Sequence, residues 1–99
     1  MAKRTFMEIL TEIGSVTNEY SAIIIRAHES GVPLYEDKDA YDELLQLKRR
    51  LDVLLQPILS ISEYKDRTYA NERMTAMQNA IGSSIYAIES HNRKKNKPD

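Results

Sequence analysis

The sequence predicts an all-α protein, an antiparallel helical bundle of three long helices that self-associates, with the second helix kinked or broken at Pro57 to give four. Two long runs predict this fold, because each places apolar residues at alternating spacings of three and four. Residues that break helices are rare, since the 99 residues include three Gly and three Pro. Cysteine is absent, so helix packing rather than disulfides has to hold the chain together.

Length and composition fit one small domain, which we expect to span residues 1–92 and to end in a flexible basic tail at residues 93–99. Hydrophobic residues make up 41% of the chain and charged residues 29%, which excludes disordered and fibrous classes. The formal net charge of −1 makes nucleic acid an unexpected partner. The longest apolar run, residues 22–25, is too short to span a membrane. Without cysteine or a signal-type apolar segment, we expect a cytoplasmic location.

The first helix has clear start and stop signals. Thr5 followed by Glu8 forms a capping box, and Gly31 followed by Pro33 ends the helix. The helix is therefore roughly 25 residues, or about 38 Å, long. Its core-facing stripe is apolar or aromatic at every position: Phe6, Ile9, Ile13, Val16, Tyr20, Ile23 and Ala27.

The second helix begins after a loop, with either Asp37 or Asp39 as its N-cap. Pro57 lies inside its apolar stripe, lacks an amide donor and would clash with the carbonyl of Val53. Because the stripe keeps its phase across the proline, a kinked continuous helix is favoured. The alternative is two shorter helices, with Pro57 opening the third. The stripe consists of Ala40, Leu44, Leu47, Leu51, Leu54, Ile58 and Ile61.

The last helix has a poorly marked start, because the preceding segment holds neither Gly nor Pro. We place the turn at residues 66–69, with Thr68 as a candidate cap. The basic tail that follows this helix is expected to fray. The residues that face the core are Ala70, Met74, Met77, Ile81, Ile85 and Ile88.

Two glycines interrupt helical runs within the same short motif, Ile-Gly-Ser. Gly14 and Gly82 each cost about 1 kcal/mol against Ala in a helix interior, so a compensating role is expected. We favour a close crossing of the parallel first and last helices, where the two glycines would lie at comparable heights. A crossing between subunits, a polar floor for a ligand, and a helix that simply tolerates a weak position remain as alternatives.

Long stretches of these two helices lack charge. Glu19 is the one charged residue from Gly14 to Ile25, and Glu89 is the one from Thr75 to Ser90. A polar, uncharged and partly aromatic face has the composition of an interface core, although an ordinary hydrophilic face is the alternative. We therefore predict a homo-oligomer, most simply a two-fold dimer. The predicted interface residues are Gly14, Ser15, Tyr20, Thr75, Asn79, Gly82, Ser83 and Tyr86.

No motif for catalysis, a cofactor or a metal stands out. His28 and His91 lie near helix ends, where a cation is favoured by the helix dipole. The acidic cluster at residues 36–43 lacks the glycine turn of a calcium loop and is better explained by helix capping. We therefore expect that the protein is not an enzyme and takes no cofactor.

The predicted function is a small non-enzymatic protein-interaction module that acts as an inhibitor, immunity-type, adaptor or regulatory protein. Its expected partners are a second copy of itself and an unidentified protein. The alternatives are a small-molecule or nucleotide binder with a site between subunits, and a nucleic-acid-associated regulator. This format is common among small accessory proteins of bacteria and phages. Candidate contacts for an anionic partner are Lys48, Arg49, Arg50, Arg93, Lys94 and Lys95.

Overall fold

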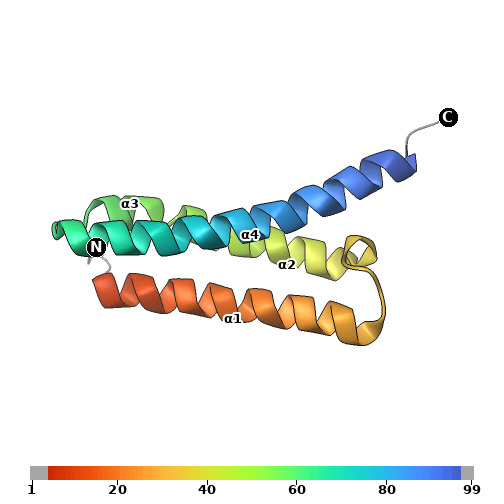
Figure 1. The fold of residues 1–99 in the computed structure, drawn as a ribbon, viewed down its shortest axis with the longest axis horizontal. Coiled ribbons are helices and arrows are strands. Elements are labelled where there is room, and N and C mark those ends of the chain that lie inside the picture. The colour runs from red at the N-terminus through yellow and green to blue at the C-terminus, as the bar shows by residue number, and fades with distance from the viewer. Residues whose placement is uncertain (1–4, 97–99) are drawn as a thin grey trace.

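A computed structural model describes the backbone of residues 5–96 and the side chains of residues 5–94. Within this part of the chain every regular element is a helix, which confirms the all-α bundle. α1 and α4 run in the same direction and α2 runs opposite to both, in a rod of 54 × 29 × 24 Å (Figure 1). The elements are α1 (Phe6–Ser30), the short 3-10 helix η1 (Leu34–Glu36), α2 (Lys38–Asp52), α3 (Leu55–Leu59) and α4 (Tyr64–Asn96).

The predicted capping signals of α1 are confirmed. The Glu8 amide donates to Thr5 Oγ1 at 3.1 Å, and the Thr5 amide donates to Glu8 Oε1 at 3.3 Å. At the other end Gly31 adopts φ 74°, a left-handed conformation that favours glycine, and its amide donates to the His28 carbonyl. α1 spans 25 residues, the predicted length.

The start of α2 resolves one open alternative. Asp37 rather than Asp39 is the N-cap, because Asp37 Oδ1 accepts from the Ala40 amide at 3.0 Å. The short helix η1, which the sequence did not predict, fills the loop directly before it. The chain therefore turns from α1 into α2 through Gly31, η1 and the Asp37 cap.

The segment around Pro57 contradicts the favoured prediction of a kinked continuous helix. α2 ends at Asp52, Val53 and Leu54 form a turn, and α3 begins at Leu55. Pro57 is then the third residue of α3, in the first turn, where its missing amide leaves no hydrogen bond unmade. The alternative of two shorter helices is correct. Val53 and Leu54 keep φ and ψ near helical values, so the stripe holds its phase across the break.

The next turn also differs from the prediction. The chain reverses at residues 60–63, and α4 begins at Tyr64 rather than after residues 66–69. The Arg67 amide donates to the Glu63 carbonyl at 2.9 Å, which begins the helical ladder. The Arg67 side chain donates to the Ile61 carbonyl at 3.1 Å and thereby ties the turn to the new helix. Thr68 consequently lies inside α4 and does not cap it.

The far end of α4 is longer than predicted. The helix continues through Asn96, so residues 93–96 of the predicted tail are helical, and residues 97–99 lie outside the described part. In Figure 1 this end diverges from α1 and extends beyond the loop that joins α1 to α2. Asn92, Arg93 and Lys94 near this end are exposed.

The core is made of the predicted stripes. Phe6, Tyr20, Ile61 and Met77, which were also predicted to face it, are half-buried at its edges. None of the described polar or charged residues is buried. The buried residues are Ile9, Ile13, Val16, Ile23, Ala27, Ala40, Leu44, Leu47, Leu51, Leu54, Ile58, Ala70, Met74, Ile81, Ile85 and Ile88.

The favoured interpretation of the two glycines is wrong. A Cβ atom added to Gly14 or Gly82 would meet nothing within 4 Å, so neither residue permits a close crossing inside the bundle. Their heights differ as well. Tyr20 bonds Ser84, so residues of α1 lie level with residues of α4 that are 64 positions later in the chain. Gly14 is therefore level with Gln78, about one turn (5.4 Å) before Gly82. Both glycines leave open space beside their backbones.

Candidate protein-interaction surfaces

The seam between α1 and α2 is closed by charges that pair within the chain. Arg50 Nε donates to Glu12 Oε1 at 2.8 Å, and the guanidinium also bonds Glu19 and, at 3.2 Å, Ser15 Oγ. The hydrogen bonds to Glu19 and Glu12 raise the pKa of Arg50 above its ordinary value. Arg50 and Ser15 are thus engaged inside the molecule, unlike the free contacts that the sequence predicted.

A second pair extends this seam toward the loop. Arg26 donates to both carboxylate oxygens of Glu43, at 3.2 and 2.7 Å, and these bonds raise the pKa of Arg26. Both side chains remain substantially exposed. The seam therefore aligns α1 with α2, and its exposed pairs add only modest stability.

The seam between α1 and α4 is held by a neutral contact. The Tyr20 hydroxyl lies 2.8 Å from Ser84 Oγ and 3.4 Å from the Ala80 carbonyl. Tyr20 is half-buried between the two helices, so it fastens α4 to α1 rather than facing outward. Of the predicted interface residues, Ser15 and Tyr20 therefore serve contacts within the chain.

The remaining predicted interface residues lie away from the core. Gly14 is exposed on α1. The one charge on the neighbouring stretch of α1, Glu19, pairs with Arg50. On α4, Gly82 is half-exposed and the exposed fraction of Tyr86 is 67%. We define the α4 face as Thr75, Asn79, Gly82, Ser83 and Tyr86; its other three members are exposed.

Charged residues lie at both ends of the α4 face. Glu72 precedes it, and Arg93 and Lys94 follow it. All three are exposed, and among the described residues none of them has an ion-pair partner. The predicted contact Lys95 belongs to the same end, although the structure does not describe its side chain. The α4 face is thus neutral in its middle, negative at the Glu72 end and net positive at the other end, where Arg93 and Lys94 outnumber Glu89.

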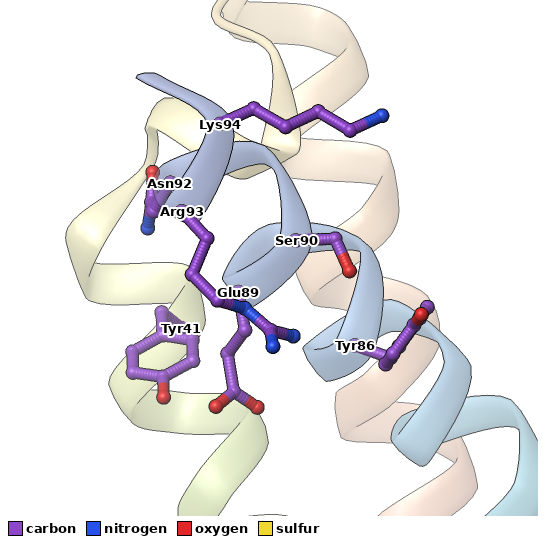
Figure 2. A pocket seen from close by; sticks show the side chains of 7 residues that line it. All are labelled: Tyr41, Tyr86, Glu89, Ser90, Asn92, Arg93 and Lys94. Atoms are coloured by element: carbon purple, nitrogen blue, oxygen red, sulfur yellow. The ribbon is translucent and has the colours of Figure 1, made fainter. Parts of the chain in front are cut away.

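A shallow hollow of about 1090 Å³ lies where α4 passes the start of α2. Figure 2 shows Tyr41 on α2 at one side and Tyr86 on α4 at the other, with the Arg93 guanidinium pointing toward the space between Tyr86 and Glu89. Sequence reasoning did not bring these residues together, because it could not place α2 against the end of α4. The lining residues are Tyr41, Tyr86, Glu89, Ser90, Asn92, Arg93 and Lys94.

η1 packs against the same end of α4 through Tyr35 and His91. The rings of Tyr35 and His91 lie 3.8 Å apart between centroids and are inclined by 30°, so they stack. His91 is therefore half-buried against η1. This contact positions the start of the last turns of α4, including Arg93 and Lys94.

An exposed apolar surface on α3 was not predicted. We define the α3 patch as Val53, Leu55 and Leu59, with exposed fractions of 63%, 43% and 56%. The sequence does hold a signal, because residues 53–62 contain no charge and more aliphatic residues than the core stripe uses. The exposed cations Lys48 and Arg49 lie in the last turns of α2, just before the patch.

Three comparisons with known proteins return nothing: no family model, no curated protein and no solved structure matches the chain. Over residues 5–96, none of the helices combines the length and apolarity needed to cross a membrane. The described side chains form no group of three or more potential metal ligands.

Proposed function

We propose that the protein is a non-enzymatic protein-interaction module that binds a protein partner through the α3 patch, and so blocks or recruits that partner. The observation that carries this proposal is the exposure of Val53, Leu55 and Leu59 in a segment without charge. Exposed aliphatic side chains that lie next to one another are costly in water and mark surfaces that a partner covers. Leu55 and Leu59 are one helical turn apart, so both point to the same side of α3.

The surroundings of the α3 patch indicate the chemistry of the partner. Lys48 and Arg49 are exposed beside it, and neither has an ion-pair partner among the described residues. A matching partner presents apolar side chains next to carboxylates, since complementary charges at an interface rim speed association and select against wrong partners. The engagement of Arg50 with Glu12 and Glu19 leaves too small a cationic group on α2 to favour nucleic acid.

A double substitution in the α3 patch tests the proposal. A protein captured from source-cell lysate is identified by mass spectrometry, purified and titrated against the wild type and Leu55→Lys/Leu59→Lys. We expect the double variant to bind at least about tenfold more weakly, because two apolar contacts become charged. Ile25→Lys is the matched control, since Ile25 is 55% exposed on α1 and should leave binding unchanged.

Circular dichroism and thermal melting establish that both variants fold. Equal affinity of the wild type and Leu55→Lys/Leu59→Lys for the purified partner would overturn the assignment of the patch. Loss of affinity in Ile25→Lys to the same extent would contradict it as well, because the effect would then not depend on position.

A further inference from the structure

We propose that the α4 face is covered by a second copy of this chain, with the two α4 helices antiparallel and a two-fold axis beside Gly82 and Ser83. This proposal goes beyond partner binding at the α3 patch and does not depend on it. It assigns an occupant to the surface where the sequence indicated self-association, and it fixes the register of the contact.

The charges along α4 are spaced symmetrically about Gly82 and Ser83. Glu72 lies about 16 Å before the Gly82–Ser83 position, and Arg93 lies about 16 Å after it, at a rise of 1.5 Å per residue. An antiparallel pair centred between Gly82 and Ser83 therefore brings Glu72 of each copy against Arg93 and Lys94 of the other. The contact forms twice, and it satisfies three charges that lack a partner among the described residues.

The residues of the α4 face, which lie between Glu72 and Arg93, are uncharged. Residues near a two-fold axis meet their own copies, so a charge there would face a like charge. The α4 face is neutral at the centre, and the same register places Asn79 opposite Tyr86 and Thr75 opposite Ser90. A parallel pairing would instead set Glu72 against Glu72 and Arg93 against Arg93, which like-charge repulsion disfavours.

The backbone at Gly82 has open space beside it. Nothing in the chain lies within 4 Å of a Cβ added there, so the residue has no packing partner in its own bundle. Next to a two-fold axis the missing side chain lets the second backbone approach. The same arrangement brings Glu72 of the second copy toward the hollow of Figure 2, where the Arg93 guanidinium points toward the space between Tyr86 and Glu89.

Cysteine trapping tests the register directly, because the chain has no cysteine of its own. Under mild oxidation, Ser83→Cys should form a disulfide-linked dimer, since residue 83 lies beside the axis and therefore close to its own copy. Ser21→Cys, an exposed serine on α1, is the matched control and should form no disulfide-linked dimer. Efficient cross-linking of the control without cross-linking of Ser83→Cys would overturn the register.

Mass and charge exchange test the contacts. Light scattering at tens of micromolar and low salt should give twice the 11.4 kDa of one chain, and Ser83→Arg should give 11.4 kDa. Glu72→Lys, and separately Arg93→Glu/Lys94→Glu, should each weaken the dimer about tenfold, and combining all three should restore it to within about threefold. Gln46→Arg, on the exposed side of α2, should not change the mass.

A wild-type mass of 11.4 kDa, or a triple variant no stronger than its parents, would overturn the proposal. Retained helicity in circular dichroism shows that each variant folds. Binding of Ser83→Arg to the partner of the α3 patch, measured separately, distinguishes failure of this contact from failure of the proposed function.

Discussion

The α3 patch and the α4 face are both exposed and both free of charge, yet they differ in chemistry. The patch is aliphatic and stands next to cations of one sign, Lys48 and Arg49. The α4 face is polar, contains Gly82 where the backbone is open, and has opposite charges at its two ends. One surface is self-complementary under a two-fold rotation and the other is not.

This difference shows how two neutral surfaces on one small bundle can have unlike occupants. A surface flanked by one sign of charge repels its own copy, so it selects a partner of different composition. A surface whose charges exchange sign from end to end attracts its own copy in the antiparallel direction. Neutrality marks both surfaces, and the arrangement of the surrounding charges indicates the occupant.

The α3 patch depends on core residues that hold α3 in place. Removing one of them should give the largest loss in the free energy of unfolding. Leu54 and Leu55 are neighbours in sequence, with exposed fractions of 0% and 43%. Leu54→Ala should lower the free energy of unfolding by about 2–5 kcal/mol, because it opens a cavity in the core. Leu55→Ala should lower it by less than about 1 kcal/mol. Urea denaturation measures both, and equal losses would mean that the patch is part of the core.

The apolar spacing of the sequence predicted the helices and every buried residue of the described chain, because the helical period sets which side chains can share one interior. It did not predict that the helix breaks at Val53 and Leu54, before Pro57. The phase of the stripe survives in both alternatives, since Val53 and Leu54 stay near helical dihedral angles. The turn at residues 60–63 was missed because it is built from hydrogen bonds by Ser60 and Arg67, without Gly or Pro.

The candidate surfaces were less predictable, because they depend on contacts between distant residues. Ser15 and Tyr20 have the composition of an interface, but Arg50 and Ser84 engage them within the chain. The α3 patch was missed because the apolar stripe accounts for Leu54 and Ile58 and leaves their apolar neighbours Val53, Leu55 and Leu59 unassigned. Apolar residues outside the core stripe of a helical segment indicate an exposed apolar surface.

Substitutions of the three glycines separate helix propensity from a contact at the α4 face. Gly14→Ala should raise the free energy of unfolding by about 0.5–1 kcal/mol, because Ala has the higher helix propensity and the added Cβ meets nothing. Gly82→Ala should raise the free energy of unfolding by the same amount in dilute solution. At concentrations where the dimer forms this gain should disappear, because the added methyl group lies at the contact between the two α4 helices. Gly31→Ala should destabilise, since φ is 74° there. Thermal melts at two protein concentrations separate these outcomes.

The smallest expected effect belongs to the seam between α1 and α2, which lies outside both surfaces. Arg50→Gln should lower the free energy of unfolding by about 1 kcal/mol or less, because the guanidinium is partly exposed and its ion pairs with Glu12 and Glu19 are solvent-screened. The difference should shrink at 1 M salt, where the Debye length is about 3 Å. Dimer mass and partner affinity should stay unchanged; a change in either would show that the seam is coupled to the surfaces.

The bond between Tyr20 and Ser84 has a consequence for the order of folding. It joins residues 64 apart in the chain, whereas the pair of Arg26 and Glu43 spans 17. Closing the longer loop costs about 1 kcal/mol more chain entropy, so we expect the contact between α1 and α4 to form after the hairpin of α1 and α2. In a dimer joined through α4, the docking of this helix and subunit association stabilise each other by mass action. We therefore expect that dilution of such a dimer weakens the contact between α1 and α4.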